Sequence, residues 1–111
     1  MADKDSQYND TVGQVADIFK LMGDQTRLRI LLECLDSEVA VGGLVEALDL
    51  SQSLISHHLR LLRGARLVRH ERRGKNVFYT AADDHVRHIV RDMMEHAREE
   101  VFMGRHRARV T

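Results

Sequence analysis

The chain has 111 residues and a formal net charge of zero, with 43% hydrophobic and 31% charged residues, as in one ordinary globular domain. No run approaches the roughly 18 apolar residues of a membrane span, and the polar, acidic start lacks the apolar core of a secretion signal, so neither a membrane protein nor a secreted protein is expected. The single cysteine, Cys34, excludes an internal disulfide and favours a reducing compartment, so we expect a cytoplasmic protein.

The first half of the chain is predicted to be helical. Apolar residues recur at helical spacing over residues 12–22, and residues 1–10 are expected to be flexible. A second, strongly apolar helix follows the N-cap residue Asp24 and ends near residue 36. Residues 40–50 then predict a short third helix, which a pair of glycines opens.

The second half combines a helix, a hairpin and a long last helix. Ser51 is a suitable N-cap for a fourth helix that ends near Gly64. The segment "LVRHERRGKNVFYT" at residues 67–80 predicts two short strands around a glycine turn. A last helix begins near Asp83 and passes residue 100, and residues 104–111 are expected to be flexible. We therefore expect residues 1–111 to form a single domain that is mostly α with a small β-hairpin.

Positive charge is concentrated in the middle of the chain. Residues 51–80 contain seven Lys or Arg against one acidic residue, Glu71, a balance of +6. Residues 1–50 contain four against ten, a balance of −6, and residues 81–111 contain six of each. A basic block of this kind inside a neutral chain is a candidate surface for a polyanion such as DNA.

The basic block has the order of elements of a DNA reader. Two short helices joined by a tight turn are typical of a helix-turn-helix, whose second helix enters the major groove with small polar groups and arginines on its outer face. The hairpin that follows would be a wing that touches the DNA backbone or the minor groove. The candidate contacts to base edges and phosphates are Gln52, Ser53, Ser56, His57, Arg60 and Arg63 on the helix, with Arg72, Arg73 and Lys75 at the tip of the wing.

The basic block also contains a histidine that is not expected to contact DNA, and the block as a whole has an alternative interpretation. His58 falls between two leucines on the helical wheel, so we expect it to be half-buried and structural rather than a DNA contact. The whole block could also be a solvated amphipathic helix beside a basic turn.

The segments "LSQSLISHHLRLLRGARLVRHERRGKNVFYT" and "DIFKLMGDQTRLRILLECL" carry a family resemblance. The first resembles the DNA-reading core of the ArsR/SmtB winged helix-turn-helix repressors of bacteria, and the second resembles their first two helices. The similarity covers roughly residues 12–100. It implies a cytoplasmic bacterial homodimer that binds double-stranded operator DNA and represses transcription until an inducer, often a metal ion, binds.

The last helix gathers histidines and acidic residues in the segment "DDHVRHIVRDMMEHAREE". His85, His96 and Glu99 share one helical face, and an N-cap aspartate at position 83 can turn its carboxylate back towards His85. Asp83 and Glu99 are about 24 Å apart along the axis, whereas the ligands of one metal ion lie within a few ångströms of each other. Antiparallel pairing of this helix with its copy in a two-fold dimer would complete two sites, each with two ligands from each subunit.

The resemblance extends to this segment. The pattern Asp-x-His-x10-His-x2-Glu, formed by Asp83, His85, His96 and Glu99, is similar to the zinc site on the last helix of the zinc-sensing members. Two imidazoles and two carboxylates suit Zn(II), with Co(II) or Ni(II) as alternatives.

Other residues define the limits of this metal hypothesis. His88 and Asp92 could be ligands or hydrogen-bond partners of ligands, and His106 could extend the shell towards six-coordinate Ni(II) or Co(II). The stretch "VAVGGLVEAL" lacks the cysteines that soft-metal sensors of the family use before the reading helix, so sensing of arsenic, lead or cadmium there is not expected.

We therefore expect a metal-responsive transcriptional repressor that dimerises through its first and last helices, binds operator DNA when metal-free and is released by Zn(II). One alternative is a repressor of the same family with a different inducer, Co(II), Ni(II) or a non-metal, in which the last helix serves only dimerisation. Another is a non-specific architectural DNA binder. A small zinc hydrolase is not expected, because the chain has no H-E-x-x-H motif and no nucleophile beside a base.

Overall fold

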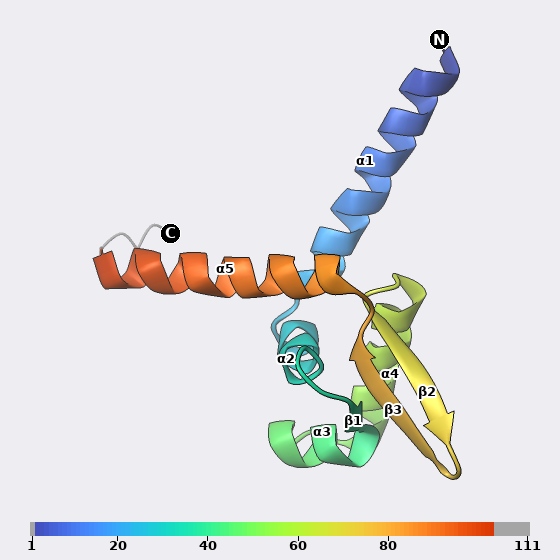
Figure 1. The fold of residues 1–111 in the computed structure, drawn as a ribbon, viewed down its shortest axis with the longest axis vertical. Helices are drawn as coiled ribbons and strands as arrows, with labels where there is room; N and C mark the ends of the chain where they lie inside the picture. Colours follow the sequence, from blue (N-terminus) through green and yellow to red (C-terminus); the bar gives the residue numbers. More distant parts are fainter. Residues whose placement is uncertain (1, 104–111) are drawn as a thin grey trace.

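Within residues 2–103, which a computed structural model describes together with the side chains of residues 4–99, the chain forms five helices and one three-stranded antiparallel sheet (Figure 1). In chain order the elements are α1 (Ala2–Met22), α2 (Gln25–Glu33), β1 (Val39–Ala40), α3 (Val41–Leu48), α4 (Gln52–Gly64), β2 (Val68–Arg73), β3 (Asn76–Ala81) and α5 (Asp84–Met103). The predicted mostly α fold with a β-hairpin is confirmed. None of the helices in the described residues is long and apolar enough to cross a membrane.

The predicted caps of α2 and α4 are confirmed by hydrogen bonds. A carboxylate oxygen of Asp24 accepts from the backbone N–H of Arg27 at 3.0 Å, and Ser51 Oγ accepts from the N–H of Leu54 at 3.1 Å. Each bond satisfies a backbone donor that has no partner inside its helix. The starts of α2 and α4 are therefore set by single side chains that the sequence identifies.

Two elements differ from the sequence-based prediction. Helix α1 begins at Ala2 rather than near residue 12, and its first half projects from the rest of the fold (Figure 1). Hydrophobic periodicity misses this part because its polar residues bury no face. Strand β1 was not predicted, because two residues carry no periodicity and their pairing with β3, Val39 with Tyr79, is long-range.

A shorter difference occurs at the end of α2. The helix ends at Glu33 rather than near residue 36, and Cys34 caps it with an N–H that donates to the carbonyls of Ile30 and Leu31. Cys34 is fully buried and fills the core as a small apolar side chain.

The hydrophobic core fixes α4 with its polar face outward. Ile55, Leu59 and Leu62, predicted to share the inner side of this helix, are all buried. They pack with side chains from α2, α3, α5 and the base of the hairpin, chiefly Ile30, Leu31, Leu44, Val68, Ala81 and Val90. Because the apolar side of α4 is buried in this way, its opposite side is presented to solvent.

The sheet has the order β1-β3-β2, with β3 in the middle. The β2–β3 hairpin pairs Val68 with Ala81 at its base and Arg73 with Asn76 at its tip, around a turn in which Gly74 has a φ of 61°. Glycine adopts this left-handed conformation without a Cβ clash. Side chains alternate between the two faces of a strand, so Arg72 and Arg73 point to opposite faces of the wing.

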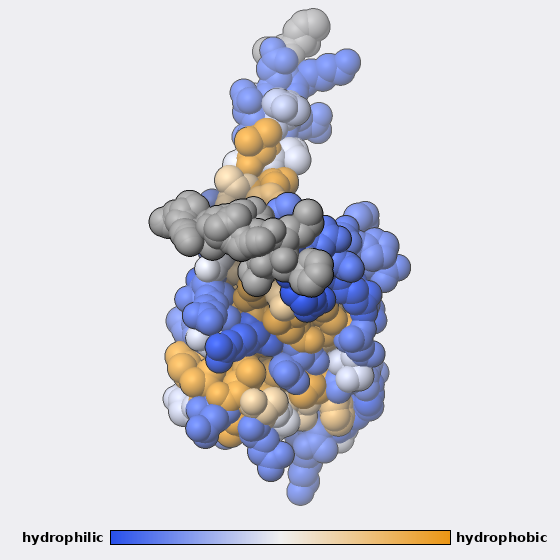
Figure 2. Space-filling view, turned by 90° about the vertical axis from the view of Figure 1, so that its left-hand side faces the viewer, coloured by the Kyte–Doolittle hydropathy of each residue, from blue (hydrophilic) through white to orange (hydrophobic). Residues whose placement is uncertain are grey.

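Apolar side chains remain exposed on α1. Val12, Val15 and Phe19 retain 50%, 41% and 51% of their accessible surface. Hydrophobic side chains are visible on this projecting helix in Figure 2. An apolar stripe at helical spacing that stays about half exposed among the described residues is typical of an interaction surface.

Candidate nucleic-acid interface and metal half-site

The polar face of α4 carries the candidate DNA contacts together. Gln52, Ser53, His57, Arg60 and Arg63 are exposed, and Ser56 is half-buried. The helix starts with the small polar residues and ends with the arginines. This arrangement allows close approach of the helix start to base edges while the arginines reach phosphates.

His58 lies on the other side of α4 and is buried, with 9% of its surface exposed. Arg27 Nη1 is 3.3 Å from His58 Nδ1, and Arg27 Nε donates to the carbonyl of Leu21 at 2.9 Å. Because arginine can only donate, Nδ1 is the acceptor and the proton of the neutral ring is on Nε2. Burial lowers the pKa of His58, which favours this neutral form. Arg27 thereby connects α4 to the corner between α1 and α2.

The three cations at the wing tip have different surroundings. Arg72 and Lys75 are exposed. Arg73 is exposed too, but it forms an ion pair with Glu38, a second with Glu71 at 3.3 Å, and a contact between its guanidinium and the Phe78 ring at 4.7 Å from the ring centre. Hydrogen bonds to Glu38 and Glu71 raise the pKa of Arg73 above its usual value.

The start of α5 brings two candidate metal ligands together. Asp83 precedes the helix, and its Oδ1 accepts from the N–H of Val86 at 3.1 Å and lies 3.5 Å from His85 Nδ1. The Val86 N–H and the neighbouring His85 hold the pKa of the Asp83 carboxyl below its usual value. The side chains of His85 and Asp83 are 97% and 55% exposed, so a metal ion from solvent or a side chain of another subunit can reach both.

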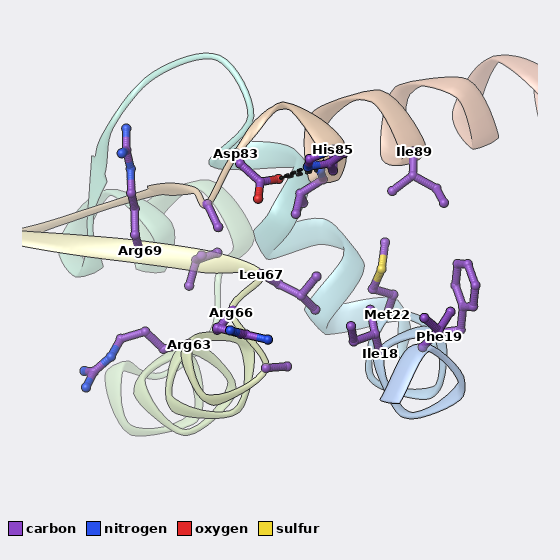
Figure 3. Close-up of a pocket in the computed structure, with 15 residues that line it drawn as sticks. Ile18, Phe19, Met22, Arg63, Arg66, Leu67, Arg69, Asp83, His85 and Ile89 are labelled. Atoms are coloured by element: carbon purple, nitrogen blue, oxygen red, sulfur yellow. Dashed lines mark hydrogen bonds and ion pairs between the residues drawn. The ribbon is translucent and has the colours of Figure 1, made fainter. Parts of the chain in front are cut away.

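A hollow of about 660 Å³ adjoins this pair, between α1, the α4–β2 connection and the start of α5 (Figure 3). Ile18, Phe19 and Met22 of α1 line one side of it. Another edge is lined by Arg63, Arg66 and Arg69. Asp83 and His85 lie next to each other at the rim. The hollow therefore joins the apolar stripe of α1 to the candidate metal ligands.

The other two candidate ligands lie farther along α5. His96 and Glu99 are exposed residues of the same helix, 11 and 14 positions after His85. Among the described residues of one chain, no group of three or more His, Cys, Asp and Glu side chains is close enough to hold a metal ion. His88 and Asp92 are exposed on α5, whereas His106, like the end segment 104–111, lies outside the described residues.

Helix α5 and the end of β3 are held to the loop between α2 and β1 by contacts that sequence reasoning missed. Arg87 Nε donates to the carbonyl of Leu35 at 3.0 Å, and Arg91 forms an ion pair with Asp36. The backbone N–H of Ala81 donates to the carbonyl of Cys34 in the same loop at 2.9 Å. These partners are 47 to 55 positions apart in the chain, so no local pattern could have paired them.

The comparisons with known proteins identify the family. The family described as "Bacterial regulatory protein, arsR family" matches residues 24–70. The chain is 39% identical over 90 residues to the transcriptional repressor SmtB homolog of Synechocystis sp., a match that covers 81% of this chain and 68% of that protein. The chain belongs to the ArsR family of bacterial regulatory proteins. As an ArsR-family member it is a transcription regulator and not an enzyme.

Two further ArsR-type relatives agree with this assignment. The cadmium resistance transcriptional regulatory protein CadC homolog of Staphylococcus aureus is 34% identical over 91 residues, covering 81% of this chain and 75% of that protein. A solved homodimeric winged helix-turn-helix DNA-binding domain from Mycobacterium bovis, a possible ArsR-family transcriptional regulator, matches with a TM-score of 0.81 and 26% identity. That match covers 88% of this chain and 91% of the other, which confirms the winged helix-turn-helix fold.

The match to the family model does not extend over the whole chain. Residues 24–70 contain α2, α3, α4 and the start of β2, and so include the candidate DNA contacts of α4 but not the wing-tip cations Arg72, Arg73 and Lys75. Helix α5 lies beyond the matched residues. Its role in this ArsR-family protein therefore has to be argued from its own side chains.

Proposed function

We propose that this ArsR-family protein is a metal-responsive repressor in the bacterial cytoplasm, which binds operator DNA as a metal-free homodimer and is released by Zn(II). The observation that carries the proposal is the pairing of Asp83 with His85 at the exposed start of α5. His96 and Glu99 lie on the same helix about 16 to 21 Å along its axis from His85. Each chain thus offers one pair of metal ligands at each end of the described part of α5.

The DNA-reading surface is formed by α4 and the wing. On α4 the proposed contacts are the exposed or half-buried polar residues Gln52, Ser53, Ser56, His57, Arg60 and Arg63. On the wing, Arg72, Arg73 and Lys75 are all exposed, and Arg73 differs from the other two because it forms ion pairs with Glu38 and Glu71. The buried inner face of α4 and the Arg27–His58 contact hold the reading helix in a fixed position.

The partner of α1 and α5 is a second copy of the chain. Val12, Val15 and Phe19 of α1 and Met93 of α5 are exposed apolar residues. Phe19 and Met93 also line a second apolar hollow of about 320 Å³ between the two helices. Burial of such a surface in a two-fold dimer removes it from water, and the Mycobacterium bovis relative is homodimeric.

The donor set of the proposed metal site fits zinc. Antiparallel packing of two α5 helices would place Asp83 and His85 of one subunit near His96 and Glu99 of its partner, giving two identical sites per dimer. Imidazole nitrogens and carboxylate oxygens are ligands that Zn(II) accepts, and Co(II) and Ni(II) use the same donors. When bound, zinc supplies a cross-link between the subunits.

The named function of the CadC homolog raises the question of cadmium, which prefers thiolate ligands. The chain has one cysteine, Cys34, and it is buried in the core. Burial raises the pKa of its thiol to about 12, so Cys34 does not offer a thiolate at neutral pH. The residues of this chain therefore favour a metal that nitrogen and oxygen donors bind.

Release follows from a change in the geometry of the dimer. A cross-link between the two α5 helices favours one arrangement of the subunits, and the two α4 helices then no longer match successive major grooves. By linkage, zinc lowers the affinity for DNA by the same factor as DNA lowers the affinity for zinc.

The test is the affinity of the dimer for the DNA upstream of its own gene, measured by fluorescence anisotropy with EDTA, Zn(II), Co(II) or Ni(II). Zn(II) is expected to weaken binding, and His85→Ala and His96→Ala are expected to bind DNA equally well with and without it. The alternative, a family member with a different inducer, predicts no tight zinc binding and unchanged DNA affinity in every metal. A non-specific architectural protein would bind random and upstream duplexes equally at one salt concentration.

A further inference from the structure

Arg73, the last residue of β2, crosses the width of the wing sheet. Its guanidinium lies over the ring of Phe78 in the middle strand and reaches Glu38, which immediately precedes the outer strand β1. Glu71, two positions earlier on the same face of β2, forms the second ion pair. We propose that Arg73 is a positioning residue that holds the hairpin against β1, and that the wing contacts phosphates through Arg72 and Lys75 instead.

The charges around Arg73 argue against a phosphate contact. Glu38 and Glu71 both pair with Nη2 of its guanidinium, which also lies over the Phe78 ring, so a phosphate at Arg73 would meet two carboxylates beside the same cation. Arg72 points to the opposite face of the hairpin, and Lys75 belongs to the turn itself. A phosphate beside Arg72 therefore lies on the face of β2 that carries neither Glu71 nor Arg73.

Glu38 is a suitable anchor because the loop before β1 is held on several sides. The carbonyls of Cys34 and Leu35 accept from Ala81 N–H and Arg87 Nε, and Asp36 pairs with Arg91 of α5. Directly after Glu38, β1 pairs with β3 through Val39 and Tyr79. Arg73 therefore connects the tip end of the hairpin to a loop that is fixed to both β3 and α5.

The contribution of the pair to overall stability is expected to be small. The side chains of Arg73 and Glu38 are 46% and 41% exposed, and ion pairs in such surroundings add little to the free energy of unfolding. Its effect lies in the orientation of the hairpin, which decides whether Arg72 and Lys75 reach the DNA backbone. The inference rests on the proposed DNA-binding function and specifies how the wing takes part in it.

Whether Arg73 positions the wing or contacts a phosphate can be decided at Glu38, because the two roles predict opposite effects of Glu38→Gln on DNA binding. If Glu38 positions Arg73, Glu38→Gln loosens the wing and weakens DNA binding. If Glu38 competes with DNA for a phosphate-binding Arg73, Glu38→Gln frees the cation and strengthens binding. Glu46→Gln on α3 is the matched control, because it removes the same charge from an exposed glutamate outside the cluster.

A charge swap provides the decisive experiment. Binding of the full-length protein to a short random-sequence duplex is measured by fluorescence anisotropy over a range of salt concentrations. Arg73→Glu alone is expected to weaken binding by about tenfold, and the double variant Arg73→Glu with Glu38→Arg, which restores the pair and the net charge, is expected to recover most of that loss. A double variant that binds no better than Arg73→Glu, or a Glu38→Gln variant that binds more tightly than its control, would overturn the proposal.

Two controls separate this inference from the proposed function. Arg72→Ala is expected to reduce the slope of log affinity against log salt by about 1, as one lost phosphate contact does. An unchanged slope in Arg72→Ala beside a reduced slope in Arg60→Ala would contradict the wing assignment alone. Unchanged binding in both would contradict DNA reading by α4 and the wing together. Thermal unfolding of each variant within a few degrees of the parent confirms that loss of binding does not reflect loss of the fold.

Discussion

Asp83 Oδ1 lies 3.5 Å from His85 Nδ1, although residues two positions apart point to different faces of a helix. The contact exists because Asp83 precedes α5 and folds back as its cap, with Val86 N–H donating to the same oxygen. Because Asp83 caps the helix, its oxygen and the His85 nitrogen lie side by side, although the spacing of two residues would separate them within a helix. The carboxylate is held ionised by the same contacts, which is the form that binds a metal.

The shared metal site predicts a specific complementation between subunits. His85→Ala and His96→Ala homodimers are each expected to lose both zinc sites, because every site contains one residue of each kind. In a mixed dimer one site lacks both histidines, and the other retains both. The mixed dimer is therefore expected to bind one zinc ion tightly, measured by calorimetry on dimers purified with two different affinity tags.

The mixed dimer also excludes a site within one chain. If all ligands came from the same subunit, each subunit of the mixed dimer would carry a broken site and no tight binding would return. His57→Ala is the matched control, since it removes an exposed histidine of α4 and is expected to leave two zinc sites per dimer. Zinc affinity in the broken sites should fall by about 100-fold or more.

A substitution of Arg60 tests the proposed DNA-reading surface independently of metal. Arg60 is an exposed cation on α4, and we expect Arg60→Ala to weaken binding to all duplexes and to reduce the salt slope by about 1. Arg29→Ala removes an exposed arginine from α2, which is outside α4 and the wing, and is expected to retain the parent slope. Equal loss of slope in both variants would indicate a general effect of net charge.

The buried His58 predicts a dependence of stability on pH. Burial lowers its pKa in the folded state, so the unfolded chain, with a histidine pKa of about 6.5, binds more protons in that range. Stability due to this residue is present above about pH 6.5 and declines as the pH falls towards the lower folded-state pKa. The thermal unfolding midpoint should therefore decrease less between about pH 7.5 and about pH 5.5 in His58→Gln than in the parent. The exposed neighbour provides the control: His57→Gln should retain the full decrease, and an equal decrease in all three proteins would contradict the role of His58.

Cys34 is expected to be chemically silent in the folded protein. Its thiol is buried and its pKa is raised to about 12, so almost none of it is thiolate at neutral pH. Iodoacetamide should label the chain at this position only after denaturant unfolds it, as measured by intact mass spectrometry. Rapid labelling of the native dimer would show that the core around α2 opens.

Local signals in the sequence account for much of the fold. The caps Asp24 and Ser51, the buried side of α4 and the glycine turn of the hairpin each depend on residues close together in the chain, and each was predicted. Strand β1 depends on a partner strand far along the chain, and no pattern of neighbours specifies it. The polar first half of α1 likewise buries nothing that periodicity can detect.

The candidate site likewise contains pairs of residues that are close in the chain and pairs that are far apart in it. Asp83 and His85 could be paired from the sequence, because a helix start has its own signal and the two residues are adjacent to it. The Arg73–Glu38 and Arg91–Asp36 ion pairs could not, since their members are 35 and 55 positions apart. The sequence alone therefore does not distinguish Arg73 from the other wing cations, because its pairing with Glu38 exists only in the folded chain.

In the proposed function, metal binding at α5 and DNA binding at α4 oppose each other. The most direct test of this opposition is the affinity of the dimer for its upstream DNA at one salt concentration, without metal and with two zinc ions shown to be bound per dimer. Zinc is expected to weaken this affinity by about 5- to 150-fold, and DNA is expected to weaken zinc binding by the same factor. The same DNA affinity in both states, with zinc demonstrably bound, would contradict it.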